Sequence, residues 1–278
     1  MRDLMITPNV SCTMTDGIAD VRLTRTDKAN ALSGAMFDDL IAAGQLLAGT
    51  EALRAVVLSG AGSGFCAGID MAVLDGMATG QIAGEKDLVT RTHGICNRFQ
   101  YAAWVWRELP VPVIAAIHGY ALGGGFELSL GADMRYVTPD ARLSVMEIKW
   151  GLVPDMGGTQ LMRHLAREDI VRELTYTGRV FSGTEAFEYG FATRVTQTPF
   201  DCAHETAREI AAKSPQAMRA LKRLLNSAVV ADPRAGLIDE TIEQQALVGS
   251  PGQIAVVRAG RMESQPSNEP TLGSSGTP

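Results

Sequence analysis

The fold of this chain is decided by the stretch Ile114-Ala-Ala-Ile-His118-Gly-Tyr-Ala-Leu-Gly123-Gly-Gly125-Phe-Glu127-Leu-Ser-Leu-Gly131. It begins as an apolar run typical of a buried strand, passes through three consecutive glycines and becomes apolar again around one carboxylate. Glycine adopts backbone angles closed to other residues and lets a ligand approach the main chain closely. If a helix begins at the triplet, its free N–H groups and the positive end of its dipole point outward together. The stretch therefore predicts a strand, a turn and a helix start that can bind a phosphate or stabilise an oxygen on which negative charge develops.

The composition favours a globular protein and argues against several kinds of partner. The 278 residues are 46% hydrophobic, which is enough for one large domain or for a domain with an appendage. The formal net charge of −6 disfavours nucleic acid as the main partner, because phosphate binding is driven by clustered Lys and Arg. No run of about 18 apolar residues is present, so we expect no membrane span. The cysteines lack metal-ligand spacing, which favours a reducing, cytoplasmic location without zinc: Cys12, Cys66, Cys96 and Cys202.

Strands and helices alternate along the first part of the chain. Asp16-Gly17, between two alternating runs, is a strong hairpin signal. Ser33 can cap a helix that runs to about Ala48, and a longer helix is expected over residues 85–109. The expected strands are residues 10–15, 18–24, 54–58, 134–138 and 141–145.

The last part of the chain has a helical pattern only. Helices are expected over residues 200–213, 215–228, 234–247 and 252–263. The final stretch is rich in Ser, Gly, Pro and Thr, which is typical of a disordered tail. We therefore divide the chain into an α/β core (1–196), a helical region (197–263) and a tail (264–278).

Familiar nucleotide-binding and nucleophile motifs are not matched. Gly60-Ala-Gly62-Ser-Gly64-Phe65 lacks the last glycine of the dinucleotide-binding pattern, and no acidic residue stands about 20 positions further on in a second βα unit. No glycine-rich run ends in Gly-Lys-Ser/Thr, and the surroundings of Ser129 are not those of a nucleophile elbow. These patterns argue against a dinucleotide fold, a P-loop and a serine hydrolase.

Three carboxylates point to acid/base chemistry when they are taken together. Glu127 alone can be a helix-start carboxylate stabilised by the dipole, and Asp155 alone can be a turn residue before two glycines. Glu147 lies near the end of an apolar strand and can be an edge residue paired with Lys149 or Arg142. Beside glycine-rich turns that can donate backbone N–H groups, the three carboxylates suggest proton transfer next to an oxyanion site.

The chain resembles the crotonase (enoyl-CoA hydratase/isomerase) superfamily over about residues 10 to 262. As an ordered set the matching segments are specific: Asn30-Ala-Leu, Phe65-Cys-Ala-Gly-Ile-Asp70, Pro112 through Glu127, Ala132-Asp133, Gly151-Leu-Val-Pro and Gly157-Gly-Thr. The resemblance implies a spiral of strand–strand–helix units, a C-terminal helical region that builds trimers or dimers of trimers, and acyl-CoA thioester substrates. It implies no separate cofactor, because coenzyme A is part of the substrate.

The resemblance also assigns roles to individual residues. By the family's pattern the backbone N–H groups of Ile69 and Gly124 form an oxyanion hole for the thioester enolate. Two such donors stabilise a transition state by roughly 3–4 kcal/mol each. The regions expected to bind CoA and the acyl chain comprise Arg25, Lys28, Ala29, Ala67, Gly68, Asp70, Met71 and Gly123. Arg25 and Lys28 can each pair with a CoA phosphate or remain solvated surface charges.

The family contains two reactions that fit the carboxylates. Hydratases carry two glutamates at the spacing of Glu127 and Glu147, so hydration of a trans-2-enoyl-CoA to a 3-hydroxyacyl-CoA is the leading hypothesis. The 3,5-2,4-dienoyl-CoA isomerase branch has an aspartate at the position of Asp155, so isomerisation with Glu147 and Asp155 as the proton-transfer pair is the alternative. A non-catalytic scaffold that binds acyl-CoA or RNA is a further possibility, which the retained carboxylates disfavour.

Overall fold

The chain forms a large twisted sheet with helices on both faces and a second, smaller sheet beside it. The computed structural model describes residues 2–85 and 87–263. The large sheet has the strand order β1-β2-β3-β4-β5-β7-β10. Its strands are β1 (Arg2–Ile6), β2 (Val10–Thr15), β3 (Ile18–Leu23), β4 (Ala55–Gly60), β5 (Val113–Ile117), β7 (Met134–Val137) and β10 (Arg194–Val195).

The predicted hairpin is confirmed and begins the large sheet. Asp16 (φ 51°) and Gly17 (φ 79°) both have positive φ, as a tight two-residue turn requires, and β2 and β3 pair antiparallel from Thr15–Ile18 outward. From β3 onward each neighbouring pair is parallel. β1 was not predicted; it is an edge strand with a register shift between Asp3 and Met5. Such an interrupted and largely exposed strand gives no clean alternation in the sequence.

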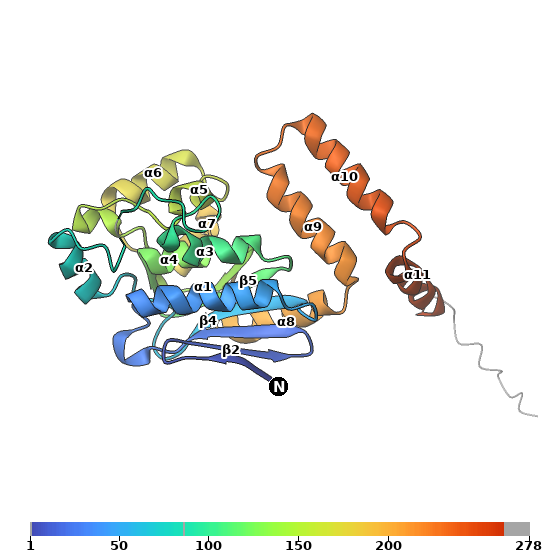
Figure 1. Ribbon diagram of the computed structural model, residues 1–278, viewed down its shortest axis with the longest axis horizontal. Helices are drawn as coiled ribbons and strands as arrows, with labels where there is room; N and C mark the ends of the chain where they lie inside the picture. Colours follow the sequence, from blue (N-terminus) through green and yellow to red (C-terminus); the bar gives the residue numbers. More distant parts are fainter. Residues whose placement is uncertain (1, 86, 264–278) are drawn as a thin grey trace, which may run out of the picture.

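Helices cover both faces of the large sheet (Figure 1). α1 (Gly34–Ala48) and α3 (Arg98–Glu108) pack together on one face, and α8 (Pro199–Ala211) packs on the other against β4 and β5. Ser33 caps α1 by accepting the N–H of Met36, as its position predicted. The two faces bury separate apolar clusters, the larger around α1 and α3.

The predicted helix over residues 85–109 is wrong in its first half. α3 begins only at Arg98, because Asn97 and Gln100 form a capping box that fixes the helix start there. The described residues between Glu85 and Asn97 form bends and turns, and Gly94 has a φ of 60°. The spacing of apolar residues in this segment predicted a helix, but the segment is a loop near the surface.

The opening stretch connects the two sheets. β5 lies in the large sheet, β6 (Tyr120–Leu122) lies in the small sheet, and α4 (Gly124–Leu130) follows directly. The crossing is made at Gly119 (φ 63°), where a side chain would collide with the carbonyl of Ser63. The small sheet has the order β6-β8-β9, with β8 (Arg142–Ser144) and β9 (Phe181–Ser182). The sequence correctly predicted a strand before the glycine triplet and a helix start at it, but it did not predict that the chain changes sheets between β5 and β6.

The remaining elements are short helices around the small sheet and a projecting C-terminal part. They are η1 (Thr26–Lys28), α2 (Met71–Ala78), η2 (Glu147–Trp150), α5 (Gly158–Met162), α6 (Glu168–Thr177), α7 (Gly183–Tyr189), α9 (Pro215–Ala228), α10 (Pro233–Leu247) and α11 (Pro251–Glu263). No helix of the described part of the chain is long and apolar enough to cross a membrane. The predicted tail, 264–278, lies outside the described residues.

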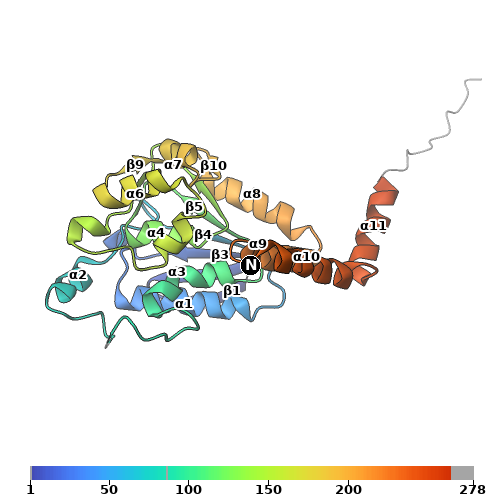
Figure 2. The ribbon, with the colours of Figure 1, turned by 90° about the horizontal axis from the view of Figure 1, so that it is seen from above.

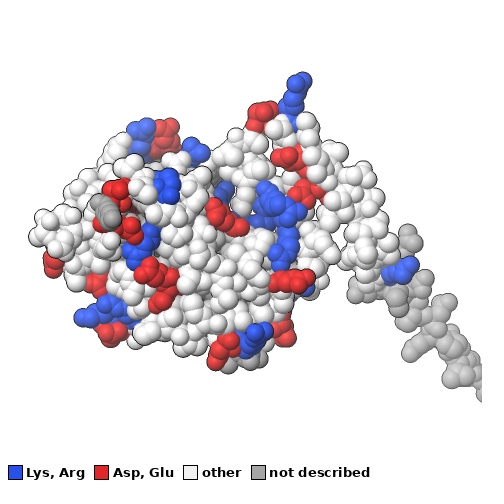
Figure 3. Space-filling view, viewed as in Figure 1, with Lys and Arg blue, Asp and Glu red and all other residues white. Residues whose placement is uncertain are grey.

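The helices α9 to α11 extend away from the sheets, as Figures 1 and 2 show. α9 is anchored to the core by Lys222, which is 5% exposed and whose Nζ lies 2.5 Å from each carboxylate oxygen of Asp133. α10 carries large apolar side chains in water, among them Leu237 (64% exposed) and Ile242 (61% exposed). On the face drawn in Figure 3, acidic and basic side chains of the described residues are interspersed over the body of the molecule.

Candidate active site

A cavity of about 420 Å³ lies between the glycine triplet, α2 and the turn after η2. Nine of the residues singled out in the sequence line it: Ala67, Gly68, Ile69, Met71, Gly123, Gly124, Glu127, Glu147 and Asp155. They come from segments up to 88 positions apart (155 − 67 = 88), so only the fold brings them together. The size is ordinary for a small-molecule site.

The N–H of Ile69 is directed away from Leu32, with which Ile69 forms an isolated parallel bridge. The N–H of Leu32 donates to the carbonyl of Gly68 (2.7 Å), and the N–H of Asp70 donates to the carbonyl of Leu32 (3.1 Å). In a parallel pair the residue between two such bonds presents its own N–H to the opposite side. Among the described residues the N–H of Ile69 has no acceptor. It is therefore available to a ligand.

Gly124 supplies a second free N–H close to the first. It is the first residue of α4, where an N–H has no partner within the helix, and it donates to no acceptor in the described chain. A Cβ built on Gly68 (φ 90°) would stand 2.5 Å from the carbonyl oxygen of Leu122 and 3.8 Å from the N of Gly124. The two loops therefore touch at a position where only glycine fits, and both residues with a free N–H line the same cavity.

Glu127 is fully buried, and only one of its two carboxylate oxygens accepts hydrogen bonds from the described residues. Its Oε1 accepts the N–H of Gly158 (2.9 Å) and the N–H of Met156 (3.3 Å), whereas its Oε2 has no partner among the described atoms. A side chain at position 158 would collide with Oε1, so glycine is required there. Burial, and then the charge of Glu147, raise the pKa of Glu127 well above its ordinary value. The backbone therefore fixes one carboxylate oxygen of Glu127, and the other receives no donor from the described residues.

Glu147 begins η2 and lies against the glycine triplet. It is 9% exposed, and its Oε1 would be 3.1 Å from a Cβ placed on Gly123. Its Oε2 also receives no donor N–H or O–H within the described structure, and its carboxyl group lies within hydrogen-bonding reach of that of Glu127. Burial raises the pKa of Glu147. The alternative in which Glu147 pairs with Lys149 or Arg142 is wrong, because neither forms an ion pair with it in the described part of the chain.

Asp155 completes a group that we call the carboxylate cluster: Glu127, Glu147 and Asp155. Burial, followed by the charge of Glu147, raises the pKa of Asp155 from 3.8 to about 6. Asp155 directly precedes the turn whose N–H groups bind Glu127. Repulsion among the three acids opposes their full ionisation at neutral pH, so the cluster can both give and take a proton.

The residues expected to contact the CoA nucleotide lie beside the cavity and do not line it. Arg25 forms an ion pair with Asp70 (2.5 Å) and also donates to the carbonyl of Ala31. Asp70 caps α2. Hydrogen bonds from the Arg25 side chain and from the N–H of Ala72 lower the pKa of Asp70. Lys28 is exposed on η1, and the carbonyl of Ala29 accepts the N–H of Ala67. Arg25 is therefore engaged within the protein in this structure.

The sequence reasoning missed the aromatic part of the cavity. Phe37 and Phe99 both line it and pack edge to face with ring centroids 4.9 Å apart. Trp150, 48% exposed, lines it near Glu147. Phe37 and Phe99 each lie on the apolar face of a helix, where spacing alone cannot separate a cavity wall from ordinary core.

The family to which the chain belongs follows from comparison with known proteins. The family model for enoyl-CoA hydratase/isomerase matches residues 13–260. The chain is therefore a member of the enoyl-CoA hydratase/isomerase family, the crotonase family, and its α/β fold with a C-terminal helical region is the fold of that family.

Curated relatives of this chain carry names that describe more than one reaction. The chain is 36% identical over 233 residues to YngF of Bacillus subtilis (strain 168), whose name places it among the enoyl-CoA hydratases/isomerases; the match covers 82% of this chain and 84% of YngF. It is 36% identical over 213 residues to the mitochondrial Δ(3,5)-Δ(2,4)-dienoyl-CoA isomerase of Rattus norvegicus, covering 74% of this chain and 64% of the rat protein.

Solved structures agree with the fold over nearly the whole chain. An enoyl-CoA hydratase of Bacillus anthracis superposes with a TM-score of 0.82 at 31% identity, covering 93% of this chain and 98% of that one. A Thermobifida fusca protein in complex with CoA superposes with a TM-score of 0.76 at 28% identity, covering 92% and 95%.

Proposed function

We propose that this protein hydrates a trans-2-enoyl-CoA to the 3-hydroxyacyl-CoA. The observation that carries the proposal is the pair of buried carboxyl groups of Glu127 and Glu147, which lie within hydrogen-bonding reach of each other. Neither Oε2 receives a donor N–H or O–H among the described residues, and the cavity is also lined by Ile69 and Gly124, whose N–H groups have no acceptor there. A buried carboxylate oxygen without a donor is costly, and either a proton shared by the two carboxyl groups or a water molecule that donates to both would satisfy it. The CoA complex of a similar structure supports a CoA thioester as the ligand.

The proposed reaction adds one water across the double bond. The N–H groups of Ile69 and Gly124 bind the thioester oxygen and stabilise the enolate that forms on it. Glu127 takes a proton from the water as its oxygen bonds to C3, while the π electrons of the double bond move toward the α-carbon and the thioester oxygen. Glu147 delivers a proton to the α-carbon. The carboxylates exchange protons with solvent afterwards, and no separate cofactor is required.

Isomerisation of a 3,5-dienoyl-CoA is the second candidate. Asp155 supports it, since it lies in the same cavity with a pKa raised to about 6 and is sensitive to the charge of Glu147. In that reaction one of these two acids removes a proton from one end of the diene system and the other returns a proton at the opposite end, without water. The similarity to the rat isomerase is consistent with it.

A spectrophotometric comparison separates the two reactions. The purified protein is given crotonyl-CoA, a longer trans-2-enoyl-CoA and a 3,5-dienoyl-CoA in parallel. We expect loss of the enoyl absorbance with the first two and little change with the third. Growth of a conjugated 2,4-dienoyl band with stable enoyl absorbance would identify the isomerase instead. Turnover of none of them, together with tight binding of acyl-CoA, would favour the non-catalytic scaffold.

We further propose that the protein assembles as a trimer or a dimer of trimers in the cytoplasm. The large apolar side chains exposed on α9 and α10 support a partner surface, since such patches are rarely left in water: Leu221, Leu225, Leu237, Ile238 and Ile242. The cysteines are free thiols, which is in keeping with a reducing compartment. Sedimentation equilibrium tests the assembly, and a monomer at micromolar concentration would contradict it.

A further inference from the structure

We propose that Asn30 is a positioning residue for the oxyanion site: its buried side-chain amide fixes the loop 61–65 and thereby aims the N–H of Ile69. This inference rests on the proposed function, because it assumes that Ile69 and Gly124 bind a thioester oxygen. Asn30 does not line the cavity and acts through the backbone of its neighbours.

The Asn30 side chain binds one loop at three points. It is completely buried, and its Nδ2 donates to the carbonyls of Ala61 (2.9 Å), Gly64 (3.1 Å) and Phe65 (3.1 Å). One amide nitrogen has two hydrogens, so both are used and one bond is shared. The backbone of Asn30 has a φ of 55°, a left-handed conformation that asparagine tolerates better than most residues.

The backbone on either side of Asn30 binds the next part of the same loop. The carbonyl of Ala29 accepts the N–H of Ala67 (3.0 Å), and Leu32 forms the two bonds that flank Ile69. The segment 29–32 is therefore joined to residues 61–65 by a side chain and to residues 67–70 by backbone. The N–H of Ile69 points away from the segment 29–32 because the two hydrogen bonds of Leu32 flank Ile69. The direction of this N–H therefore depends on the pairing.

The residue that follows this loop, Cys66, also contacts residues on either side of the second donor, Gly124. The carbonyl of Cys66 accepts the N–H of Leu122 (3.0 Å), and a Cβ on Gly125 would stand 2.6 Å from that carbonyl oxygen. A displacement of residues 61–66 would therefore move Ile69 relative to Gly124. Misplacement of a catalytic group by about 1 Å can cost a factor of about 10² in rate.

The test compares Asn30→Gly, Asn30→Ser and a matched control. Glycine keeps the left-handed backbone and removes the amide, and serine keeps one hydroxyl donor. Leu47→Ala is the control, because Leu47 is completely buried in α1, outside the cavity, and its truncation lowers the melting temperature without touching the loop. Each protein is assayed for kcat and KM with a trans-2-enoyl-CoA.

A spectroscopic measurement on a bound thioester tests directly whether the oxyanion site polarises the thioester carbonyl. The probe is a cinnamoyl-CoA with an electron-donating ring substituent, whose absorption band moves to longer wavelength when its thioester carbonyl is polarised. We expect the wild-type protein and Leu47→Ala to show this red shift. Asn30→Gly should bind the probe with little red shift and lose about 10²-fold in kcat with a smaller change in KM. Asn30→Ser should be intermediate.

Three results would overturn the inference. The first is a red shift in Asn30→Gly that is as large as that of the wild-type protein. If Asn30→Gly does not fold, the same comparison is made with Asn30→Ser. The second is an equal loss of red shift in Leu47→Ala, which would mean a general effect of instability. The third is the absence of a red shift in the wild-type protein, which would refute the Ile69–Gly124 pair. A wild-type red shift without hydration would contradict only the proposed reaction, because the variants would still report on Asn30.

Discussion

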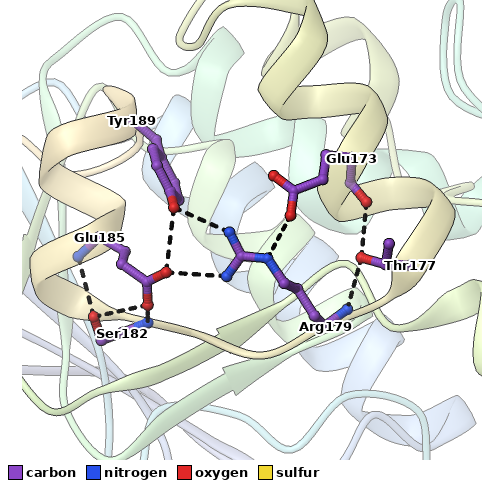
Figure 4. A network of polar contacts seen from close by, with 6 residues as sticks. All are labelled: Glu173, Thr177, Arg179, Ser182, Glu185 and Tyr189. Atoms are coloured by element: carbon purple, nitrogen blue, oxygen red, sulfur yellow. Dashed lines mark hydrogen bonds and ion pairs between the residues drawn. The ribbon is translucent and has the colours of Figure 1, made fainter.

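Two groups of acidic side chains in this molecule have opposite environments. In the network of Figure 4, Arg179 pairs with Glu173 (2.7 Å) and Glu185 (3.0 Å) and donates to the hydroxyl of Tyr189 (3.0 Å). Glu185 also accepts the N–H of Ser182, and this bond, together with Arg179, lowers the pKa of Glu185. Every charge in the network has a partner.

No cation of the described residues forms an ion pair with the carboxylate cluster. Burial raises the pKa of each of its three members, and Glu127 and Glu147 each keep one oxygen that receives no donor in the described structure. The paired network joins α6, β9 and α7, whereas the cluster faces the cavity. We infer that the network serves stability, whereas the cluster costs stability, and we propose that this cost is retained because the cluster transfers protons.

The largest expected effect is the loss of activity in Glu147→Gln. The amide has nearly the same shape, but it cannot deliver a proton to the α-carbon, so kcat for hydration should fall by about 10³-fold or more. The measurement is the initial rate of loss of the enoyl absorbance, with the melting temperature as a check on folding. A rate within tenfold of wild type would show that Glu147 is not the acid.

Glu127→Gln should come next, with a fall of about 10² to 10³-fold in kcat. The amide oxygen can still accept the N–H groups of Gly158 and Met156, so the turn should stay in place while the base is lost. The rate is measured as for Glu147→Gln. If Glu127→Gln hydrates normally while Asp155→Asn does not, the assignment of the two acids is reversed and the isomerase-type pair is favoured.

Asp155→Asn should stabilise the protein and leave hydration within about threefold of wild type. Because its pKa is raised on folding, the contribution of Asp155 to stability is complete below its ordinary pKa of 3.8 and is lost as the pH rises to about 6. Removing the charge should therefore increase the free energy of unfolding at pH 7 by up to about 3 kcal/mol. Denaturant unfolding at pH 4 and pH 7 checks this, and an equal effect at both pH values would contradict it.

Arg179→Met should have the smallest effect, a loss of about 1 kcal/mol or less in stability with unchanged kcat. The pKa of Glu185 is lowered on folding, so its stabilising contribution is present above its ordinary pKa of 4.5 and is lost as the pH falls through the lower folded value. The difference in unfolding free energy between Arg179→Met and wild type should therefore shrink in acid. A large loss of kcat would show that the network also supports the site.

Local sequence signals predicted the elements that build the site but not the contacts between them. The Asp16-Gly17 turn, the Ser33 cap and the glycine triplet each act within a few residues and were read correctly. The start of α3 was misplaced, because the capping box at Asn97 was not recognised among apolar neighbours. Family resemblance named Ile69 and Gly124, but it could not show why Ile69 has a free N–H.

Contacts between segments that are distant in the sequence could not be predicted from local sequence patterns, for a physical reason. Arg25 and Asp70 are 45 residues apart, and nothing local indicates that they pair in place of binding a phosphate. The raised pKa of Asp155 likewise depends on its burial and on the nearby charge of Glu147. Both conditions exist only when η2 and the following turn are packed in the folded protein. Such properties follow from tertiary packing.

Solvent labelling during turnover tests most directly whether the carboxylate cluster activates water. The protein is incubated with a trans-2-enoyl-CoA in water labelled with the heavy oxygen isotope, and the product is analysed by mass spectrometry. We predict a 3-hydroxyacyl-CoA that carries one solvent-derived oxygen at C3, formed about 10² to 10³-fold more slowly by Glu127→Gln under the same conditions. An unlabelled product that is an isomer of the substrate would contradict the proposed role of the cluster.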